Sequence, residues 1–408
     1  MNSDCAPFTP SSRAKRSAVE GPRDETNGQA TGSLDFARDD GGVKSSLQLR
    51  ARGLRNSPVN SERQVKVSVV GASGYAGEEL LRLLLGHNGA DLVGASSRQS
   101  AGLSLSEVFP RFAHHERARA LRFIDPNDQT KDDGAEVVFL ALPHGVASEY
   151  ATRALARGQR VIDLSADFRT KNAATYEDFY GAPHPSPQLL GQAVYGLPEF
   201  YRERIREAKL VASPGCYPTS ILVPILPLLK QGLVRPDDII ADSMSGVSGA
   251  GRKVELPYLF AECNESLRPY GVPKHRHLSE IEQELSIAAG ETVRIQFTPH
   301  LVPVSRGILT TIYLRPTEGT LAEMIAAAYG QSYSDEPFVR LLRGDALPDT
   351  KNVVGTNFLE LAWRLDPRTK RLVVMSAEDN VVKGTSGQAV QCFNIMCGFP
   401  ETTGLLLS

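Results

Sequence analysis

This chain of 408 residues has little cysteine, a net charge near zero and no long apolar run. Its cysteines, at positions 5, 216, 263, 392 and 397, form no CxxC pair and no dense framework, which argues against a disulfide-stapled secreted protein and favours a reducing compartment. The formal charge of −2 lacks the basic excess that binds nucleic acid or an anionic membrane. The apolar stretch SILVPILPLL is shorter than the roughly 18 residues of a membrane span. These scarcities predict a globular, cytoplasmic protein.

Residues 1–63 are rich in Ser, Arg, Asp, Asn and Gly and have almost no apolar periodicity. Such a segment buries too little surface to offset the entropy of ordering, so we predict a disordered N-terminal extension. It lacks the apolar core of a secretory signal, and its acidic residues disfavour a transit peptide.

From residue 65 the pattern becomes that of a βαβ unit: a β-branched run, a glycine-rich turn, an amphipathic helix ending near Gly86 and a second apolar run. A strand within 135–143, a helix within 145–158 and a strand at 160–165 continue the alternation. Alternating strands and helices favour a parallel sheet covered by helices. We therefore predict an α/β fold whose first domain is doubly wound.

After Cys216 the expected strands are longer, at 237–246, 292–304 and 306–316, with helices near 279–289 and 320–330. This pattern indicates an α+β second domain. The segment 380–399 has helical spacing after a glycine-rich start, and we expect it to return to the first domain. The predicted division is 1–63 as the extension, 64–214 with 376–408 as the nucleotide-binding domain, and 215–375 as the catalytic and oligomerisation domain.

The motif GASGYAG places Gly71, Gly74 and Gly77 between a predicted strand and a predicted helix. Glycines at this spacing let a turn close and let the backbone approach a pyrophosphate, whose charge the free amides of the helix N-terminus favour. The motif predicts a dinucleotide site. A tight turn without a ligand is the alternative.

The end of the second predicted strand reads ASSRQS, with Ser97 and Arg98 and without the carboxylate that NAD-binding proteins usually carry there. A guanidinium at Arg98 suits the 2′-phosphate of NADP, because it offers charge-assisted hydrogen bonds. We therefore predict NADP rather than NAD. A solvated surface arginine is the alternative.

The motif SPGCYPTS puts Cys216 just ahead of an apolar segment, with Pro218 suited to a first helical turn. A thiol there would feel the positive end of the helix dipole, which lowers its pKa and makes it a better nucleophile. Pro224 and Pro227 lack donors and are expected to kink or shorten this helix. A structural cysteine is the alternative.

The motif HRHLSEIEQEL places His275 and His277 before a helix that a capping box of Ser279 and Glu282 would start. A histidine near a helix N-terminus is biased toward the neutral form that a general base requires. An HxH metal pair is a rival interpretation, but no further Cys or His cluster has zinc spacing, so we predict no metal. Two ordinary loop histidines are the remaining alternative.

Arg252 and Lys253 in SGVSGAGRK, and Arg306 in PHLVPVSRG, follow tight backbone segments. Such cations could clamp a carboxylate or phosphate. Taken singly, each is better explained as a surface charge.

Together these motifs carry a resemblance to a known family. GASGYAGEEL, ASSRQSAG, LPHG, SPGCYPTS, SGVSGAGR, HRHLSEIEQEL, HLVPVSRGILTTIY and DNVVKGTSGQAVQ stand in family-like order, and from about residue 65 the chain resembles the N-acetyl-gamma-glutamyl-phosphate reductases of the semialdehyde dehydrogenase superfamily. The resemblance implies a Rossmann-type nucleotide domain, an α+β second domain, NADP(H) as cofactor and a homodimer or homotetramer.

The resemblance also implies roles for individual residues. Cys216 would be the nucleophile and His277 the acid/base, with His275 close by. Beside the resemblance, we predict His275, Arg252 and Arg306 as substrate-binding residues. The implied cofactor-binding residues are Gly71, Ser73, Gly74, Tyr75, Ala76, Gly77, Ser97, Arg98, Pro143 and Asn380.

The implied function is NADPH-dependent reduction of N-acetyl-gamma-glutamyl phosphate in arginine biosynthesis. One rival is a carrier-protein-linked aminoadipyl-phosphate reductase of lysine biosynthesis, whose motifs are similar; the motif GCYPT speaks against an aspartyl-phosphate enzyme. A rival of another class is a non-catalytic NADP-binding sensor. A sensor would have no use for both Cys216 and His277.

Overall fold

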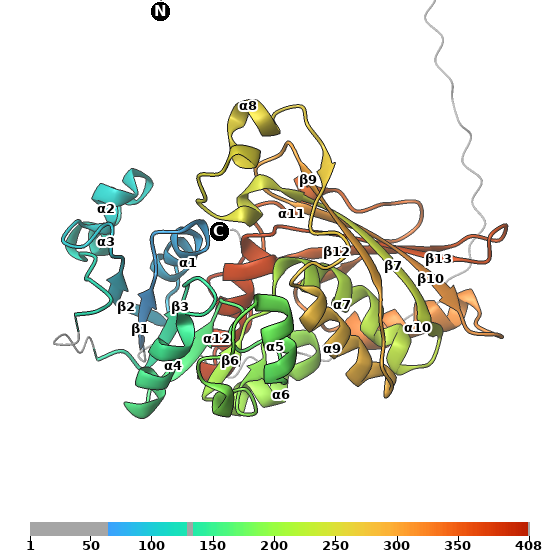
Figure 1. Ribbon diagram of the computed structural model, residues 1–408, viewed down its shortest axis with the longest axis horizontal. Helices are drawn as coiled ribbons and strands as arrows, with labels where there is room; N and C mark the ends of the chain where they lie inside the picture. The colour runs from blue at the N-terminus through green and yellow to red at the C-terminus, as the bar shows by residue number, and fades with distance from the viewer. Residues whose placement is uncertain (1–63, 129–133, 407–408) are drawn as a thin grey trace, which may run out of the picture. The chain divides into compact units, whose positions relative to one another are not determined.

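The computed structural model describes residues 64–128 and 134–406, which contain two β-sheets (Figure 1). The predicted disordered extension, residues 1–63, lies outside the described residues. The first sheet is parallel throughout and has the strand order β2 (Ala90–Ser96), β1 (Val65–Val70), β3 (Val137–Leu140), β4 (Arg160–Asp163), β6 (Leu210–Ala212) and β5 (Val194–Tyr195). The predicted doubly wound sheet is confirmed.

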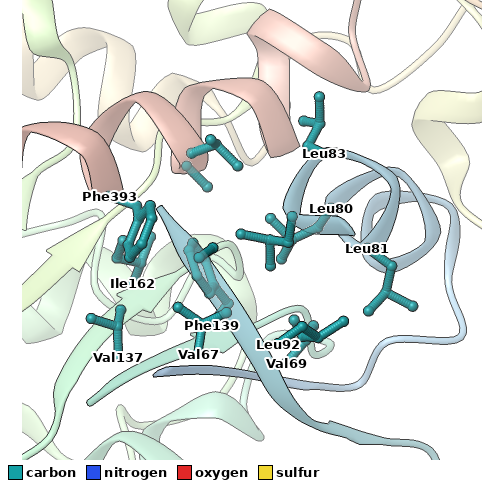
Figure 2. Close-up of a cluster of buried hydrophobic side chains, with 14 of the residues drawn as sticks. Val67, Val69, Leu80, Leu81, Leu83, Leu92, Val137, Phe139, Ile162 and Phe393 are labelled. Atoms are coloured by element: carbon teal, nitrogen blue, oxygen red, sulfur yellow. The ribbon is translucent and has the colours of Figure 1, made fainter. Parts of the chain in front are cut away.

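Both faces of the first sheet are buried, and successive residues of one strand pack on opposite faces. Phe139 of β3 packs with α1 (Tyr75–Leu85) and α12 (Gly387–Cys397), whose Phe393 lies beside it in Figure 2. Its neighbours Val138 and Leu140 pack on the other face with α4 (Ala147–Ala156). Helix α1 ends just before Gly86, as predicted, and the closing helix does return to the first sheet.

The second sheet is mixed, with the order β11 (Val339–Leu341), β12 (Leu359–Leu365), β13 (Leu372–Glu378), β10 (Ile308–Pro316), β7 (Val234–Gly246), β9 (Gln296–Val302) and β8 (Arg268–Pro269). Helices α7 (Cys216–Lys230), α9 (Leu278–Ala289) and α10 (Ala322–Tyr333) cover one of its faces (Figure 1). The predicted boundary between 375 and 376 falls inside β13, so this strand belongs with the second sheet. The domain boundaries stay a prediction.

Smaller helices complete the described part of the chain. They are α2 (Leu105–Val108), α3 (Glu116–Ala120), α5 (Ala173–Tyr180), α6 (Pro198–Glu207), α8 (Phe260–Cys263) and α11 (Thr350–Val353), together with a π-helical turn at Val382–Ser386 and short 3₁₀ turns. None of the helices in the described ranges has the length and apolarity to cross a membrane.

Helix α7 runs through both of its prolines, so the expectation that they shorten it was wrong. Pro224 cannot donate to the carbonyl of Ser220, and the hydroxyl of Ser376 donates to that carbonyl instead, at 2.7 Å. Pro227 likewise leaves the carbonyl of Val223 free, and the Tyr333 hydroxyl donates to it. Because neighbouring side chains supply the missing donors, the buried helix keeps its full length.

Helix α9 begins at Leu278, one residue before the predicted start. The predicted capping box is therefore wrong: Ser279 lies inside the first turn, where its hydroxyl donates to the carbonyl of Arg276 at 2.7 Å. Glu282 accepts instead from Arg294 and from the amide of Ile295. His277 itself occupies the N-cap position.

Candidate functional site

The glycine turn between β1 and α1 is closely packed at its ends and open at its centre. A Cβ on Gly71, whose φ is +83°, would lie 2.6 Å from the carbonyl oxygen of Ala141, and one on Gly77 would lie 2.6 Å from Ala72. A Cβ on Gly74, by contrast, would meet no described atom within 4 Å. The first amides of α1 have no intrahelical partner, so this turn fits a pyrophosphate group.

The residues predicted to read the cofactor's ribose lie at the end of β2, beside this turn. The hydroxyl of Ser97 donates to that of Ser73 at 3.0 Å, which ties the strand end to the glycine turn. Arg98 is exposed, and no ion pair holds it within the described ranges. The side chain is therefore available for an anion at this edge.

The loop after β3 contains the exposed Pro143, and Asp167 fixes this loop by hydrogen bonds. The buried carboxylate of Asp167 accepts from the amides of Gly145, at 2.6 Å, and Ser148, at 3.0 Å. These bonds fix the predicted cofactor-contacting loop at the start of α4. Asp167 was not among the residues predicted from the sequence.

The nucleophile candidate stands on a similar turn in the first sheet. Strand β6 leads through Gly215, the N-cap residue, into α7, whose first residue is the partly buried Cys216. A Cβ on Gly384 would lie 2.7 Å from the Cβ of Cys216, so the π-helical turn of the C-terminal segment packs against the cysteine.

A buried ion pair clamps the cysteine turn. Glu280 of α9 is fully buried; it accepts from the Gly215 amide at 3.1 Å and from the Tyr195 hydroxyl at 2.9 Å, and pairs with Arg169 at 3.2 Å. Arg169 in turn donates to the carbonyl of Ser213 at 2.8 Å. The pair thus holds both sides of the turn that carries Cys216.

Glu280 was not predicted from the sequence, although its spacing carried a signal. This glutamate stands three residues after His277, which is the spacing of neighbours on one helix face. The capping-box interpretation drew attention to Glu282 instead. Arg169 had no local signal, because its partners are far away in the sequence.

His277 lies against the same turn. A Cβ on Gly215 would be 2.6 Å from the Nε2 atom of His277, and this nitrogen is 3.9 Å from Glu280. Burial lowers the pKa of His277 well below its usual value, and the nearby His275, Arg169 and Arg276 lower it further. His277 is therefore neutral at neutral pH, in the form that accepts a proton.

His275 packs beside His277, with the two ring centroids 4.8 Å apart. Its Nδ1 atom accepts from the backbone amide of His277 at 3.1 Å, and burial lowers its pKa to about 4. Within residues 64–128 and 134–406, no group of three or more His, Cys, Asp or Glu side chains is arranged to hold a metal ion.

The expectation of a lowered thiol pKa at Cys216 is wrong for this structure. Burial and the charge of Glu378 raise the pKa of the thiol to about 12, and the weaker influences of the Tyr217 amide and of Arg169 do not offset them. The helix dipole is a small effect, typically under about 1 kcal/mol, and burial exceeds it. Cys216 is held as a neutral thiol.

Arg252 and Arg306, predicted to bind substrate, are engaged with carboxylates of α1. Arg252 pairs with Glu78 at 2.8 Å, and Arg306 pairs with Glu79 at 2.9 Å. Both arginines line a cavity of 640 Å³ at the start of α1. Their role toward a substrate stays a prediction.

Asn380 connects two chain segments that line this cavity. Its side chain accepts from the Gly307 amide at 2.8 Å and donates to the Ser248 hydroxyl at 2.9 Å. Six residues later, Ser386 donates to the carbonyl of Ala76 in α1 at 2.8 Å. Since Gly384 contacts Cys216, one short segment, 380–386, connects the cysteine turn with the glycine-turn helix.

Comparison with known proteins agrees with this two-part site. Residues 66–208 match the family model "Semialdehyde dehydrogenase, NAD binding domain", and residues 216–380 match "Semialdehyde dehydrogenase, dimerisation domain". Two solved structures share the fold: aspartate semialdehyde dehydrogenase II of Vibrio cholerae (TM-score 0.64, 18% identity, 82% of this chain and 99% of that chain) and the Candida albicans aspartate semialdehyde dehydrogenase with NADP (0.62, 14%, 82% and 98%).

Curated relatives are much closer in sequence. N-acetyl-gamma-glutamyl-phosphate reductase of Akkermansia muciniphila is 59% identical over 344 residues, covering 84% of this chain and 99% of the relative. The Moorella thermoacetica enzyme of the same name is 50% identical over 341 residues, covering 84% and 98%. This chain therefore belongs to the N-acetyl-gamma-glutamyl-phosphate reductase family of semialdehyde dehydrogenases.

Proposed function

We propose that this chain reduces N-acetyl-gamma-glutamyl phosphate to N-acetylglutamate 5-semialdehyde with release of phosphate, in arginine biosynthesis. The observation that carries the proposal is the segment 380–386, which contacts both Cys216 and α1. A nucleophile beside a dinucleotide turn is the arrangement that a reductase acting through a covalent intermediate requires.

The first half of the reaction uses residues of the cysteine turn. The sulfur of Cys216 attacks the acyl carbon, the bond from that carbon to the phosphate oxygen breaks, and phosphate leaves with its electron pair. The thiol proton passes to Nε2 of His277, which lies beside Gly215 and is neutral. The product of this half is a thioester on Cys216.

The second half reduces that thioester. When bound, NADPH supplies the hydride for the acyl carbon. The glycine turn from Gly71 to Gly77 would hold the pyrophosphate, and Arg98 would meet the 2′-phosphate. His277 returns its proton to the developing oxygen anion and then helps to free the cysteine as the aldehyde leaves.

Glu280 and Arg169 act as positioning residues in this scheme. They hold the backbone on both sides of Cys216 and keep a carboxylate 3.9 Å from His277, so that nucleophile and base stay in one arrangement. A fixed geometry of this kind is a large part of the rate advantage of an enzyme over solution.

The rival functions are less well supported. The curated relatives do not favour the carrier-linked reductase. A sensor that only binds NADP would have no need of a nucleophile and a neutral base clamped by one ion pair.

The uncovered face of the second sheet supports a homodimer or homotetramer as the working form. Leu309, Thr311 and Tyr313 of β10 and the exposed Met244 of β7 line a shallow hollow of 370 Å³ on the face opposite α7. A dimer would bury the apolar surface of Met244, Leu309 and Tyr313. The scattered cysteines favour a cytoplasmic location for the protein.

The test is an assay in the reverse direction with purified protein. Reduction of NADP, followed by absorbance, should depend on phosphate and on N-acetylglutamate semialdehyde, and should be absent with aspartate semialdehyde and in a Cys216→Ser variant. Reduction of NADP by the Cys216→Ser variant would show that Cys216 is not the nucleophile. No reduction of NADP by the unaltered protein with N-acetylglutamate semialdehyde would overturn the proposed function.

A further inference from the structure

Glu378, the last residue of β13, is an ionisable group that the reaction scheme does not use. Its side chain is fully buried, and within the described part of the chain neither carboxyl oxygen has a hydrogen-bond partner. Buried carboxylates are normally paired or hydrogen-bonded, because an unpartnered buried charge is costly. Such an exception in a core needs an explanation.

The explanation lies in its position beside the nucleophile. A Cβ on Gly384 would lie 2.7 Å from the Cβ of Cys216 and 3.0 Å from Oε1 of Glu378. The Cβ of Cys216 and Oε1 of Glu378 therefore both border the position of Gly384 and lie within about 6 Å of each other, the range over which one charge shifts the ionisation of another.

The positive charges nearby are engaged elsewhere. The buried ammonium of Lys383 donates to Glu199 at 2.6 Å and to the side-chain oxygens of Gln388 and Gln391. Arg169 pairs with Glu280. No cation within the described ranges forms an ion pair with Glu378.

The remaining ionisable groups around the pair are also accounted for. Asp379 is buried and accepts from the amides of Gly355 and Val381, both at 2.7 Å. Arg169 and Arg276 lower the pKa of the thiol by less than burial and Glu378 raise it, and His277 is neutral. Glu378 is therefore the group whose charge most directly opposes a thiolate at Cys216.

We propose that Glu378 and Cys216 form a coupled acid pair that carries at most one negative charge, so that an ionised Glu378 keeps Cys216 in its thiol form. The thiol then gives up its proton only to His277 during the attack on substrate, a step that rests on the proposed function. A thiol is far less open to oxidation and alkylation than a thiolate, so the pair protects the nucleophile between turnovers.

The surroundings raise the pKa of both groups. Burial raises the pKa of Glu378 well above its usual value, Lys383 lowers it in part, and burial with Glu378 raises the thiol pKa to about 12. Once Glu378 is ionised, the thiol can ionise only against a neighbouring negative charge. Below the pKa of Glu378 the carboxyl is neutral and exerts no such effect.

The experiment measures the rate of Cys216 alkylation by iodoacetamide against pH, with the labelled peptide quantified by mass spectrometry. Glu378→Gln and Glu378→Met remove the charge, Glu378→Asp keeps it, and Glu360→Gln removes a buried carboxylate from the adjacent strand β12 as a matched control. Glu378→Met loses no hydrogen bond, so it keeps the test open if the Gln variant folds poorly.

We expect both charge-removing variants to react faster on the alkaline side, by about tenfold for each unit by which the thiol pKa falls. The difference should vanish at acidic pH, and the Asp and control variants should follow the unaltered protein. Equal pH profiles for the unaltered protein and Glu378→Met would overturn the proposal. Alkylation requires no turnover, so a failed reductase assay would leave this result standing and would overturn only the reaction.

Discussion

Two turns of the first sheet enter their helices in nearly the same way. Gly74 caps α1 with φ −79° and ψ 173°, and Gly215 caps α7 with φ −69° and ψ 160°. The turn at Gly74 faces open space, whereas the amide of Gly215 already donates to the carboxylate of Glu280. The same backbone motif thus forms an open turn at one place and a closed, internally satisfied turn at the other.

This difference explains the wrong expectation for the thiol. The helix N-terminus was predicted from local sequence, and it is present at Cys216. Its effect on the thiol is opposed by burial and by Glu378, which comes from a strand more than 150 residues away in the sequence. The pKa of a group reflects the sum of its surroundings, and at Cys216 burial and a neighbouring charge outweigh the helix dipole.

Removing the carboxylate of Glu280 should give the largest effect. Glu280→Gln leaves Arg169 as a buried, unpaired charge and should cost about 3–5 kcal/mol of unfolding free energy, because a half-broken buried ion pair is strongly destabilising. Glu149→Gln removes the surface pair with Arg153 and should cost less than about 1 kcal/mol. Denaturant titration of the two variants measures both; equal losses would contradict a clamp at the cysteine turn.

Adding one methyl group to each capping glycine compares the turns directly. Gly215→Ala would place a Cβ 2.6 Å from His277 and 2.8 Å from Glu280, so we expect a loss of about 1–3 kcal/mol of stability and of most activity. Gly74→Ala meets no described atom within 4 Å and should leave thermal unfolding nearly unchanged, with its effect confined to cofactor affinity.

Thermal unfolding and the KM for NADPH should be measured on both glycine variants. If Gly74→Ala were as destabilising as Gly215→Ala, the open and closed descriptions of the two turns would be wrong.

Shortening Arg98 should give the smallest and most selective effect. Arg98→Ala removes charge-assisted bonds to a 2′-phosphate, which are worth about 1.5–3 kcal/mol, so the KM for NADPH should rise roughly tenfold to a hundredfold. The KM for NADH should change little, because NADH has no 2′-phosphate. An equal rise for both cofactors would remove Arg98 from this role.

The sequence predicted the elements whose signals are local. The glycine turn, the helix ending near Gly86 and the strand that ends shortly before Arg98 follow from periodicity and turn chemistry within about 30 residues, and the structure contains them. The position of Cys216 at a helix start also follows from its immediate neighbours.

The groups that set the chemistry of Cys216 could not be predicted in this way. Arg169, Glu280 and Glu378 lie on different elements and come together only through the packing of α9 and β13 against the cysteine turn. The length of α7 was misjudged for the same reason, because the donors that replace its proline amides come from Ser376 and Tyr333.

The central claim is that the closed turn carries a nucleophile that forms a thioester. Its most direct test is the mass of the intact protein after incubation with N-acetylglutamate semialdehyde and NADP in the absence of phosphate. We predict an added N-acetylglutamyl group on the peptide that contains Cys216, removed again when phosphate is supplied. A protein that turns over with phosphate yet never carries this group on Cys216 would contradict the account.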